Sequence, residues 1–142
     1  MIRRLSLPFV FAAALFAFGA QAQSTTSPST SQANIVTAFS HVLPNAQGKS
    51  ITGLVVTYKP GESTPPHRHG SAFVVGYVLS GAIRSQLENG KVKVYRVGDS
   101  WSEKPGANHV LSANASKTEP ASLLAIFVSD SNAPAPVIMD KQ

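Results

Sequence analysis

Two histidines separated by a single residue are the strongest chemical signal in the sequence. His67 and His69 stand in the stretch PPHRHGSAF, after a proline pair and before an apolar run. In an extended strand, residues i and i+2 point to the same face, so the two imidazoles can lie side by side. Neutral imidazoles on one wall are typical ligands of a transition metal. The pair predicts one side of a metal site, although an isolated His-x-His is weak evidence by itself.

The segments that must position these histidines are short, rich in β-branched and aromatic residues, and separated by Gly, Pro and Asn. We expect strands over 35–43, 50–59, 72–80, 82–88, 91–97, 109–114 and 122–128, and no helix. Asn89 and Gly90 lie between two alternating runs and predict a tight hairpin, because this pair tolerates positive φ. The pattern indicates an all-β sandwich or barrel. Strands 72–80 and 122–128 are apolar on both faces, which predicts an outer cover from the N-terminal strand or another subunit.

A third histidine, His109, follows two turns and begins another expected strand. Here the sequence resembles the cupin superfamily, which has a first motif G-x5-H-x-H-x3-4-E-x6-G and a second motif G-x5-P-x-G-x2-H-x3-N. The residues that fit the first motif are Gly61, His67, His69 and Gly81, and those that fit the second with small shifts in spacing are Gly98, Pro105, Gly106, His109 and Asn114. The resemblance spans roughly residues 35 to 130. It implies a double-stranded β-helix, or jelly-roll barrel.

The resemblance also implies a metal site made by His67, His69 and His109. The ion would be a divalent transition metal: Zn, Fe, Ni, Cu or Mn. Val74 stands in the position of the motif's glutamate and cannot bind a metal, so the site is expected to lack its carboxylate. Glu103 could supply the missing oxygen from a neighbouring strand end, although a glutamate beside a lysine in a turn is more often solvated.

Other side chains have a functional and a structural interpretation. Phe73, Tyr77 and Trp101 are expected to line a substrate pocket, although large aromatic residues in a small barrel usually belong to the core. Glu103 and Tyr77 are weak candidates for a catalytic acid or base. His41 lies outside both motifs, and a surface or hydrogen-bonded position is expected for it rather than a catalytic one.

The N-terminus has the pattern of a secretory signal peptide. A basic start at Arg3 and Arg4 precedes an apolar stretch and the small-residue pattern AQA, so we expect cleavage after Ala22. The expected organisation is a signal peptide over 1–22, a flexible polar leader over 23–34, a barrel over 35–130 and a tail over 131–142. The mature protein is then expected in the periplasm or outside the cell.

Composition restricts the classes of partner. Cleavage reduces twelve Lys and Arg to ten against seven Asp and Glu, so the net charge falls from +5 to +3, and the basic residues are scattered. This distribution argues against nucleic-acid binding. The absence of cysteine excludes disulfides and thiolate ligands, so any metal must be held by nitrogen and oxygen.

The function expected from these features is that of an exported cupin that binds a divalent metal and acts on, or binds, a small organic molecule. Dioxygenase-like and isomerase-like chemistry both fit such a site, in a metal-dependent oxidoreductase or isomerase. A non-enzymatic module that binds a small molecule or a metal, and a metal-free degenerate barrel, are the alternatives. A homodimer is a family-level expectation, and no membrane contact is expected after signal cleavage.

Overall fold

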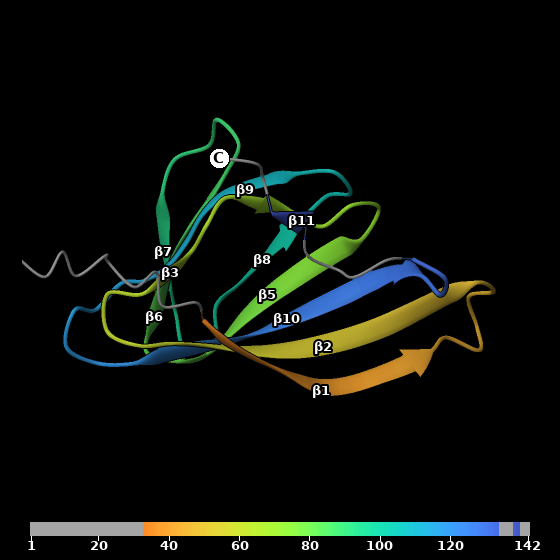
Figure 1. Ribbon diagram of the computed structural model, residues 1–142, viewed down its shortest axis with the longest axis horizontal. Coiled ribbons are helices and arrows are strands. Elements are labelled where there is room, and N and C mark those ends of the chain that lie inside the picture. Colours follow the sequence, from red (N-terminus) through yellow and green to blue (C-terminus); the bar gives the residue numbers. More distant parts are fainter. Residues whose placement is uncertain (1–32, 134–137, 140–142) are drawn as a thin grey trace, which may run out of the picture.

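The computed structural model describes residues 33–133 and 138–139, and these residues contain strands and turns but no helix (Figure 1). The predicted signal peptide and nearly all of the leader lie outside the described residues. The strands are β1 (Asn34–Val42), β2 (Lys49–Tyr58), β3 (Ser63–Thr64), β4 (His67–Arg68), β5 (Phe73–Ser80), β6 (Ala82–Leu87), β7 (Lys93–Arg96), β8 (Ser100–Glu103), β9 (Asn108–Asn114), β10 (Ala121–Asp130) and β11 (Ile138–Met139). The all-β prediction is confirmed.

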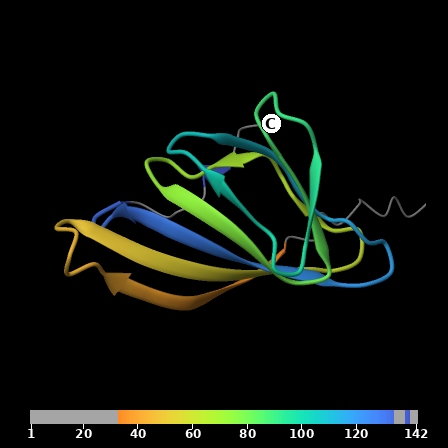
Figure 2. The ribbon, with the colours of Figure 1, turned by 180° about the vertical axis from the view of Figure 1, so that it is seen from behind.

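The strands form two antiparallel sheets that face each other. One has the order β1-β2-β10-β5-β8, and the other has the order β11-β4-β9-β6-β7, with β3 also paired to β9. Figures 1 and 2 show the sheets meeting near one end of β5 and spreading apart toward the other, as in a jelly-roll barrel. Two residues of the predicted tail form β11, which pairs with β4. Within the described residues, no helix is long and apolar enough to span a membrane.

The core lies between the two sheets and follows the alternation of the long strands. Every second residue of β2, β5 and β10 points inward and is buried: Leu54, Val56 and Tyr58; Val74 and Val78; Leu123, Ala125 and Phe127. Burial of each large aliphatic or aromatic side chain contributes about 1.5–3 kcal/mol to folding. These three neighbouring strands therefore make an apolar wall, and the opposite wall comes from β4, β6 and β9.

Gly76 is the inward-facing residue of β5 that has no side chain, and Trp101 explains why. A Cβ on Gly76 would lie only 2.4 Å from Cζ2 of Trp101, the residue that pairs with it across β5 and β8. The indole therefore lies flat over the glycine. This close approach fixes Trp101 and the strand β8, on which the next inward-facing residue is Glu103.

The structure departs from the sequence predictions at several strand ends. β6 and β7 form the predicted hairpin, but the positive φ falls on Glu88 (42°) rather than on Asn89 or Gly90, so the connection is a wider loop. The short strands β3, β4 and β8 were not predicted, because each has four residues or fewer and no long alternating run. β1 also does not cover the outer face of β5 and β10; it extends the sheet beside β2.

Candidate metal centre

His67, His69 and His109 converge in the space between the sheets. One ring nitrogen of each lies within 4.8 Å of the others, and all three side chains are buried. His67 in β4 is the cross-strand partner of His109 in β9, and His69 follows directly after β4. The ring of His69 packs edge-on against Phe127, with centroids 5.1 Å apart. The grouping predicted from the two motifs is thus present in the fold.

Glu103 joins this group from β8. Its Oε1 lies 3.1 Å from Nδ1 of His109, and its Oε2 lies 3.3 Å from Nε2 of His69. Glu103 is only 2% exposed, and its Oε2 is buried without a hydrogen bond of acceptable geometry. A buried carboxylate oxygen without a hydrogen-bond partner is costly unless another ligand, such as a cation, satisfies it. The solvated surface position that is usual for such a glutamate is therefore wrong for Glu103, and the alternative, a carboxylate beside the histidines, is what the structure has.

The register of β5 and β8 explains how Glu103 reaches the histidines. Val74, at the glutamate position of the first motif, pairs directly with Glu103 across the two strands. Both residues point into the same cavity, because directly opposed residues of antiparallel strands share a face. A carboxylate carried by β8 thus enters the cavity beside the position that the motif gives to a glutamate on β5.

Burial and mutual contacts set the charges of the group. Burial acts to raise the pKa of Glu103, but the close polar contacts and charge interactions with His109 and His69 outweigh it and hold the pKa well below its usual range. Burial lowers the pKa of His67 to about 4, against an opposing contribution from its hydrogen bond to the backbone. Near neutral pH, Glu103 is therefore ionised and His67 is neutral, the states in which both groups bind metals.

Neighbouring polar groups orient the donor atoms. Nδ1 of His67 lies 2.8 Å from the carbonyl oxygen of Pro65; a carbonyl only accepts, so Nδ1 donates and Nε2 keeps its lone pair. Nε1 of Trp101 donates to Oε1 of Glu103 at 3.1 Å, and Oγ of Ser85 lies 2.8 Å from Nε2 of His109. Such outer contacts fix the orientation of metal ligands in known sites.

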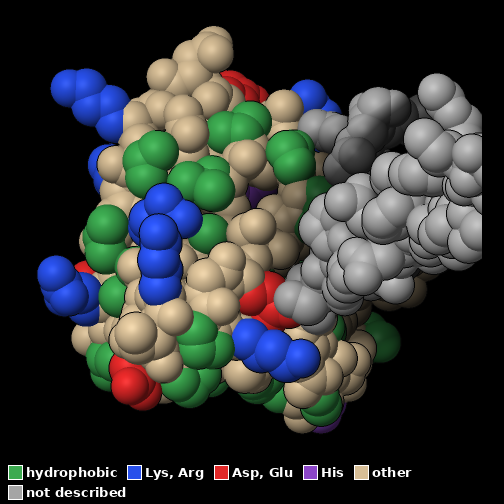
Figure 3. All heavy atoms as spheres, turned by 60° about the vertical axis from the view of Figure 1, so that its left-hand side comes forward, with side chains coloured by type: hydrophobic (Ala, Val, Ile, Leu, Met, Phe, Trp, Pro, Cys, Tyr) green, Lys and Arg blue, Asp and Glu red, His purple; other side chains and the backbone are tan. Residues whose placement is uncertain are grey.

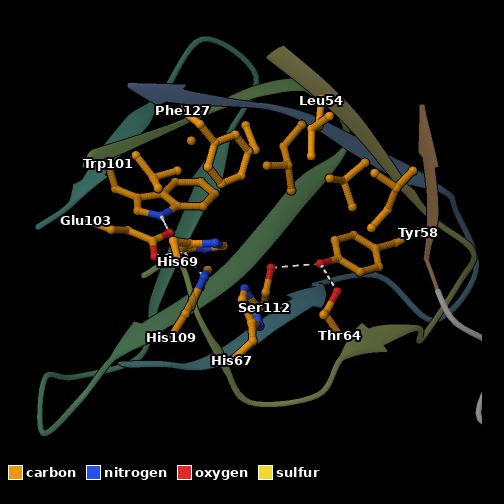
Figure 4. A pocket seen from close by; sticks show the side chains of 16 residues that line it. Leu54, Tyr58, Thr64, His67, His69, Trp101, Glu103, His109, Ser112 and Phe127 are labelled. Carbon is orange, nitrogen blue, oxygen red and sulfur yellow. Dashed lines mark hydrogen bonds and ion pairs between the residues drawn. The ribbon is translucent and has the colours of Figure 1, made fainter. Parts of the chain in front are cut away.

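The centre lies at one end of a pocket whose walls are mostly apolar (Figure 4). The cavity measures about 40 Å³, which restricts it to a small ligand. Leu54, Val56, Leu123, Ala125 and Phe127 form the apolar wall. In the space-filling view, histidine atoms are visible at the bottom of a surface hollow (Figure 3). The site is shaped for a small ligand.

The predicted pocket residues are only partly correct. Trp101 lines the pocket, but Phe73 and Tyr77 are 41% and 42% exposed and lie on the outer face of β5. The prediction was wrong because β5 is apolar on both faces, so its alternation did not reveal which residues point inward. Tyr77 therefore cannot be the catalytic acid or base. His41 is exposed on β1, as expected.

Three hydroxyl residues of the pocket were not predicted from the sequence: Tyr58, Thr64 and Ser112. Ser112 lies three residues after His109, so a regular strand would point them to opposite faces. A β-bulge changes this: Leu87 pairs with His109 and Gln86 with Leu111, which leaves one residue of β9 unpaired. Tyr58 could have been found, since it continues the inward series of Leu54 and Val56.

Comparison with known structures agrees with this architecture. An oxalate oxidase is 24% identical (TM-score 0.54; 63% of this chain and 45% of that chain covered), and the DMSP lyase DddQ from Ruegeria pomeroyi DSS-3 is 18% identical (TM-score 0.60; 76% and 51%). An uncharacterized conserved protein with a double-stranded beta-helix domain from Klebsiella pneumoniae subsp. pneumoniae MGH 78578 is 22% identical (TM-score 0.58; 80% and 90%). The chain spans about half the length of the first two proteins. At these identities, the likeness establishes the fold alone.

The sequence itself gives the family. The sequence profile described as "Cupin domain" matches residues 54–127, which is about half of the chain and runs from β2 to β10. A search among curated proteins finds no match. The matched region contains all three histidines and Glu103. By its sequence profile, its two facing sheets and its histidine cluster, the chain belongs to the cupin family.

Proposed function

We propose that the protein is a metal-dependent cupin enzyme that acts on a small organic molecule, with one divalent transition metal held by His67, His69, His109 and Glu103. The observation that carries this proposal is the buried, ionised carboxylate of Glu103 among three imidazoles, with Oε2 lacking a hydrogen bond. Three nitrogens and one anionic oxygen fit Zn, Fe, Ni, Cu or Mn, and the carboxylate favours the harder ions Mn and Fe more than three histidines alone would.

The protein groups prepare the site before any ligand arrives. Nε2 of His67 is available because Nδ1 is used by Pro65, and Trp101 and Ser85 restrain Glu103 and His109. A metal bound there would supply Lewis-acid activation of a coordinated oxygen, or redox chemistry with O2 if it is Fe, Mn or Cu. The apolar wall lowers the local polarity on one side of the cavity, which strengthens electrostatic interactions there.

Small-molecule turnover is the function that we favour over simple binding. Two proteins with the same fold are described as an oxalate oxidase and a DMSP lyase, and another oxalate oxidase structure contains the substrate analogue glycolate. The small, partly enclosed pocket beside the proposed centre supports an enzyme of this size class, either an oxidoreductase or an isomerase. A binding module that captures the same ligand without turnover is the alternative, and product formation separates the two.

Metal binding by purified protein tests the proposal. In a competitive zinc titration, Glu103→Gln should weaken affinity roughly 10- to 100-fold, because the substitution removes the charge and leaves the shape. Glu62→Gln is the matched control, since Glu62 is also buried and also has one carboxylate oxygen without a hydrogen bond, but it does not line the pocket that holds the histidines. His109→Ala should abolish stoichiometric binding. Unchanged zinc affinity in both Glu103→Gln and His109→Ala would refute the site.

We further propose that the chain is exported and forms a homodimer. Export is supported by the basic and apolar pattern over 1–22, and N-terminal sequencing of protein from the periplasm or medium should begin at Gln23.

Dimerisation is supported by the exposed side chains of Phe73, Tyr77 and Leu79 on the outer face of β5. Sedimentation analysis should give twice the monomer mass; a monomer at high concentration would refute that proposal.

A further inference from the structure

A cluster of three hydroxyl groups stands at the other end of the pocket from Glu103. The phenolic oxygen of Tyr58 lies 2.6 Å from Oγ1 of Thr64 and 2.8 Å from Oγ of Ser112. Tyr58 and Ser112 are buried, and all three residues line the same cavity as the histidines. In Figure 4, Ser112 lies between Tyr58 and the imidazole of His67, while Trp101 and Glu103 lie across the pocket. We call these three residues the hydroxyl cluster.

The register of β9 makes the hydroxyl cluster a neighbour of the metal centre. On β9, His109 faces His67 of β4, and Ser112 faces Thr64 of β3. The β-bulge between these two positions turns both His109 and Ser112 inward. The pocket therefore has a polar group at each end, and β9 contributes one residue to each: His109 to the histidines and Ser112 to the hydroxyl cluster. Apolar side chains of β2 and β10 form its wall.

The hydroxyl cluster has one more hydrogen-bond donor than its internal hydrogen bonds use. Three hydroxyls carry three protons, and the two hydrogen bonds within the cluster use two of them. No other described residue accepts a hydrogen bond from these three oxygens. Burial raises the pKa of Tyr58, so the phenol stays protonated. One O–H is thus left without an acceptor among the described residues, and because all three residues line the cavity it is available to a ligand there.

From this arrangement we infer that the hydroxyl cluster is a second binding subsite, which donates a hydrogen bond to an uncharged oxygen of a ligand whose anionic end binds at the histidine centre. This inference rests on the proposed metal centre, which would hold the anionic end. The far oxygen is uncharged, because no Lys or Arg is among the described residues that line the pocket. The small cavity restricts the ligand to a short chain. The ligand class is therefore a short monocarboxylate with a hydroxyl or carbonyl oxygen away from the carboxylate.

A pair of isosteric probes tests the subsite. 3-Hydroxypropanoate and butanoate have the same charge and the same number of non-hydrogen atoms. They differ only in that a hydroxyl group stands in place of the terminal methyl group. Calorimetric titration of the zinc-loaded protein should show 3-hydroxypropanoate binding about fivefold more tightly, the effect of one net hydrogen bond. Saturation with zinc is measured first by titration without either probe.

The variant removes all three hydroxyls at once: Tyr58→Phe, Thr64→Val and Ser112→Ala. A single substitution would leave orphan hydroxyls, whereas replacing all partners with apolar groups of similar shape preserves folding. The matched control makes the same three changes on outward-facing residues, Thr57→Val, Tyr77→Phe and Ser80→Ala. The preference for 3-hydroxypropanoate should disappear in the pocket variant and persist in the control, while zinc affinity stays unchanged in both.

The outcomes separate the two proposals. Absence of the preference in the wild type, failure to bind either probe, or a preference that survives in the pocket variant would overturn the subsite while leaving the metal centre in place. The last result would mean that the second oxygen binds elsewhere, for example at the metal. A wild-type protein that takes up no zinc would overturn the proposed function, and this ligand class with it.

Discussion

Acid should destabilise the metal-free protein through one buried imidazole. His67 is almost fully buried, and its pKa falls to about 4 in the folded state from 6.5 in the unfolded chain. Between these pH values the unfolded chain binds a proton that the folded chain excludes, so stability is lost as the pH falls from 6.5 toward 4. The slope is about 1.4 kcal/mol per pH unit over roughly 2.5 units and flattens near pH 4, where folded His67 itself begins to bind a proton, so the loss by pH 4 is about 3 kcal/mol.

Urea denaturation in the presence of a chelator, at pH 7 and at pH 4, measures this loss. The pH-dependent decrease in unfolding free energy should be about 3 kcal/mol smaller in His67→Gln than in the wild type. His41→Gln is the control, because His41 is exposed, and it should keep the wild-type decrease. Glu103, with its lowered pKa, adds a further loss only below about pH 4.5, and it does so in all three proteins. An equal decrease in His67→Gln and the wild type would show that His67 does not cause the loss of stability in acid.

Three further outcomes are expected, two from the packing and one from metal binding. Gly76→Ala should lower stability by about 1–3 kcal/mol in thermal unfolding, because its Cβ would meet the indole of Trp101 at 2.4 Å; wild-type stability would contradict this close contact. Phe127→Ala should cost about 3–5 kcal/mol by leaving a cavity, whereas Leu79→Ala, 42% exposed on the outer face, should cost much less. Chelation of bound metal should lower the melting temperature, since metal binds the folded state; an unchanged temperature would argue against a stabilising centre.

The sequence predicted the features that depend on local pattern. Period-two alternation and turn residues were enough for most of the long strands and for the all-β class. The resemblance to the two cupin motifs predicted that His67, His69 and His109 lie close together. In the fold they converge because β4 pairs with β9. Strand and turn patterns, and each of the two motifs, lie within a short stretch of chain.

The features that the sequence did not predict depend on register between strands. Glu103 lies 29 positions from Val74 in sequence, and only the pairing of β5 with β8 places its carboxylate where the motif's glutamate would be. The inward direction of Ser112 depends on the bulge in β9, and the outward direction of Tyr77 depends on which face of β5 packs on the core. A one-residue shift along a strand moves each side chain to the opposite face of the sheet, so it reverses which residues point into the pocket.

The metal centre is tested most directly by diffraction from crystals of the mature chain, Gln23 onward, grown with zinc and measured at the zinc absorption edge. We expect one strong anomalous peak between the three imidazoles and Glu103, with zinc–nitrogen distances near 2.0–2.1 Å and a carboxylate oxygen of Glu103 at about 2.0–2.2 Å. An anomalous peak elsewhere on the protein, or none in crystals that keep the histidine cluster, would contradict it.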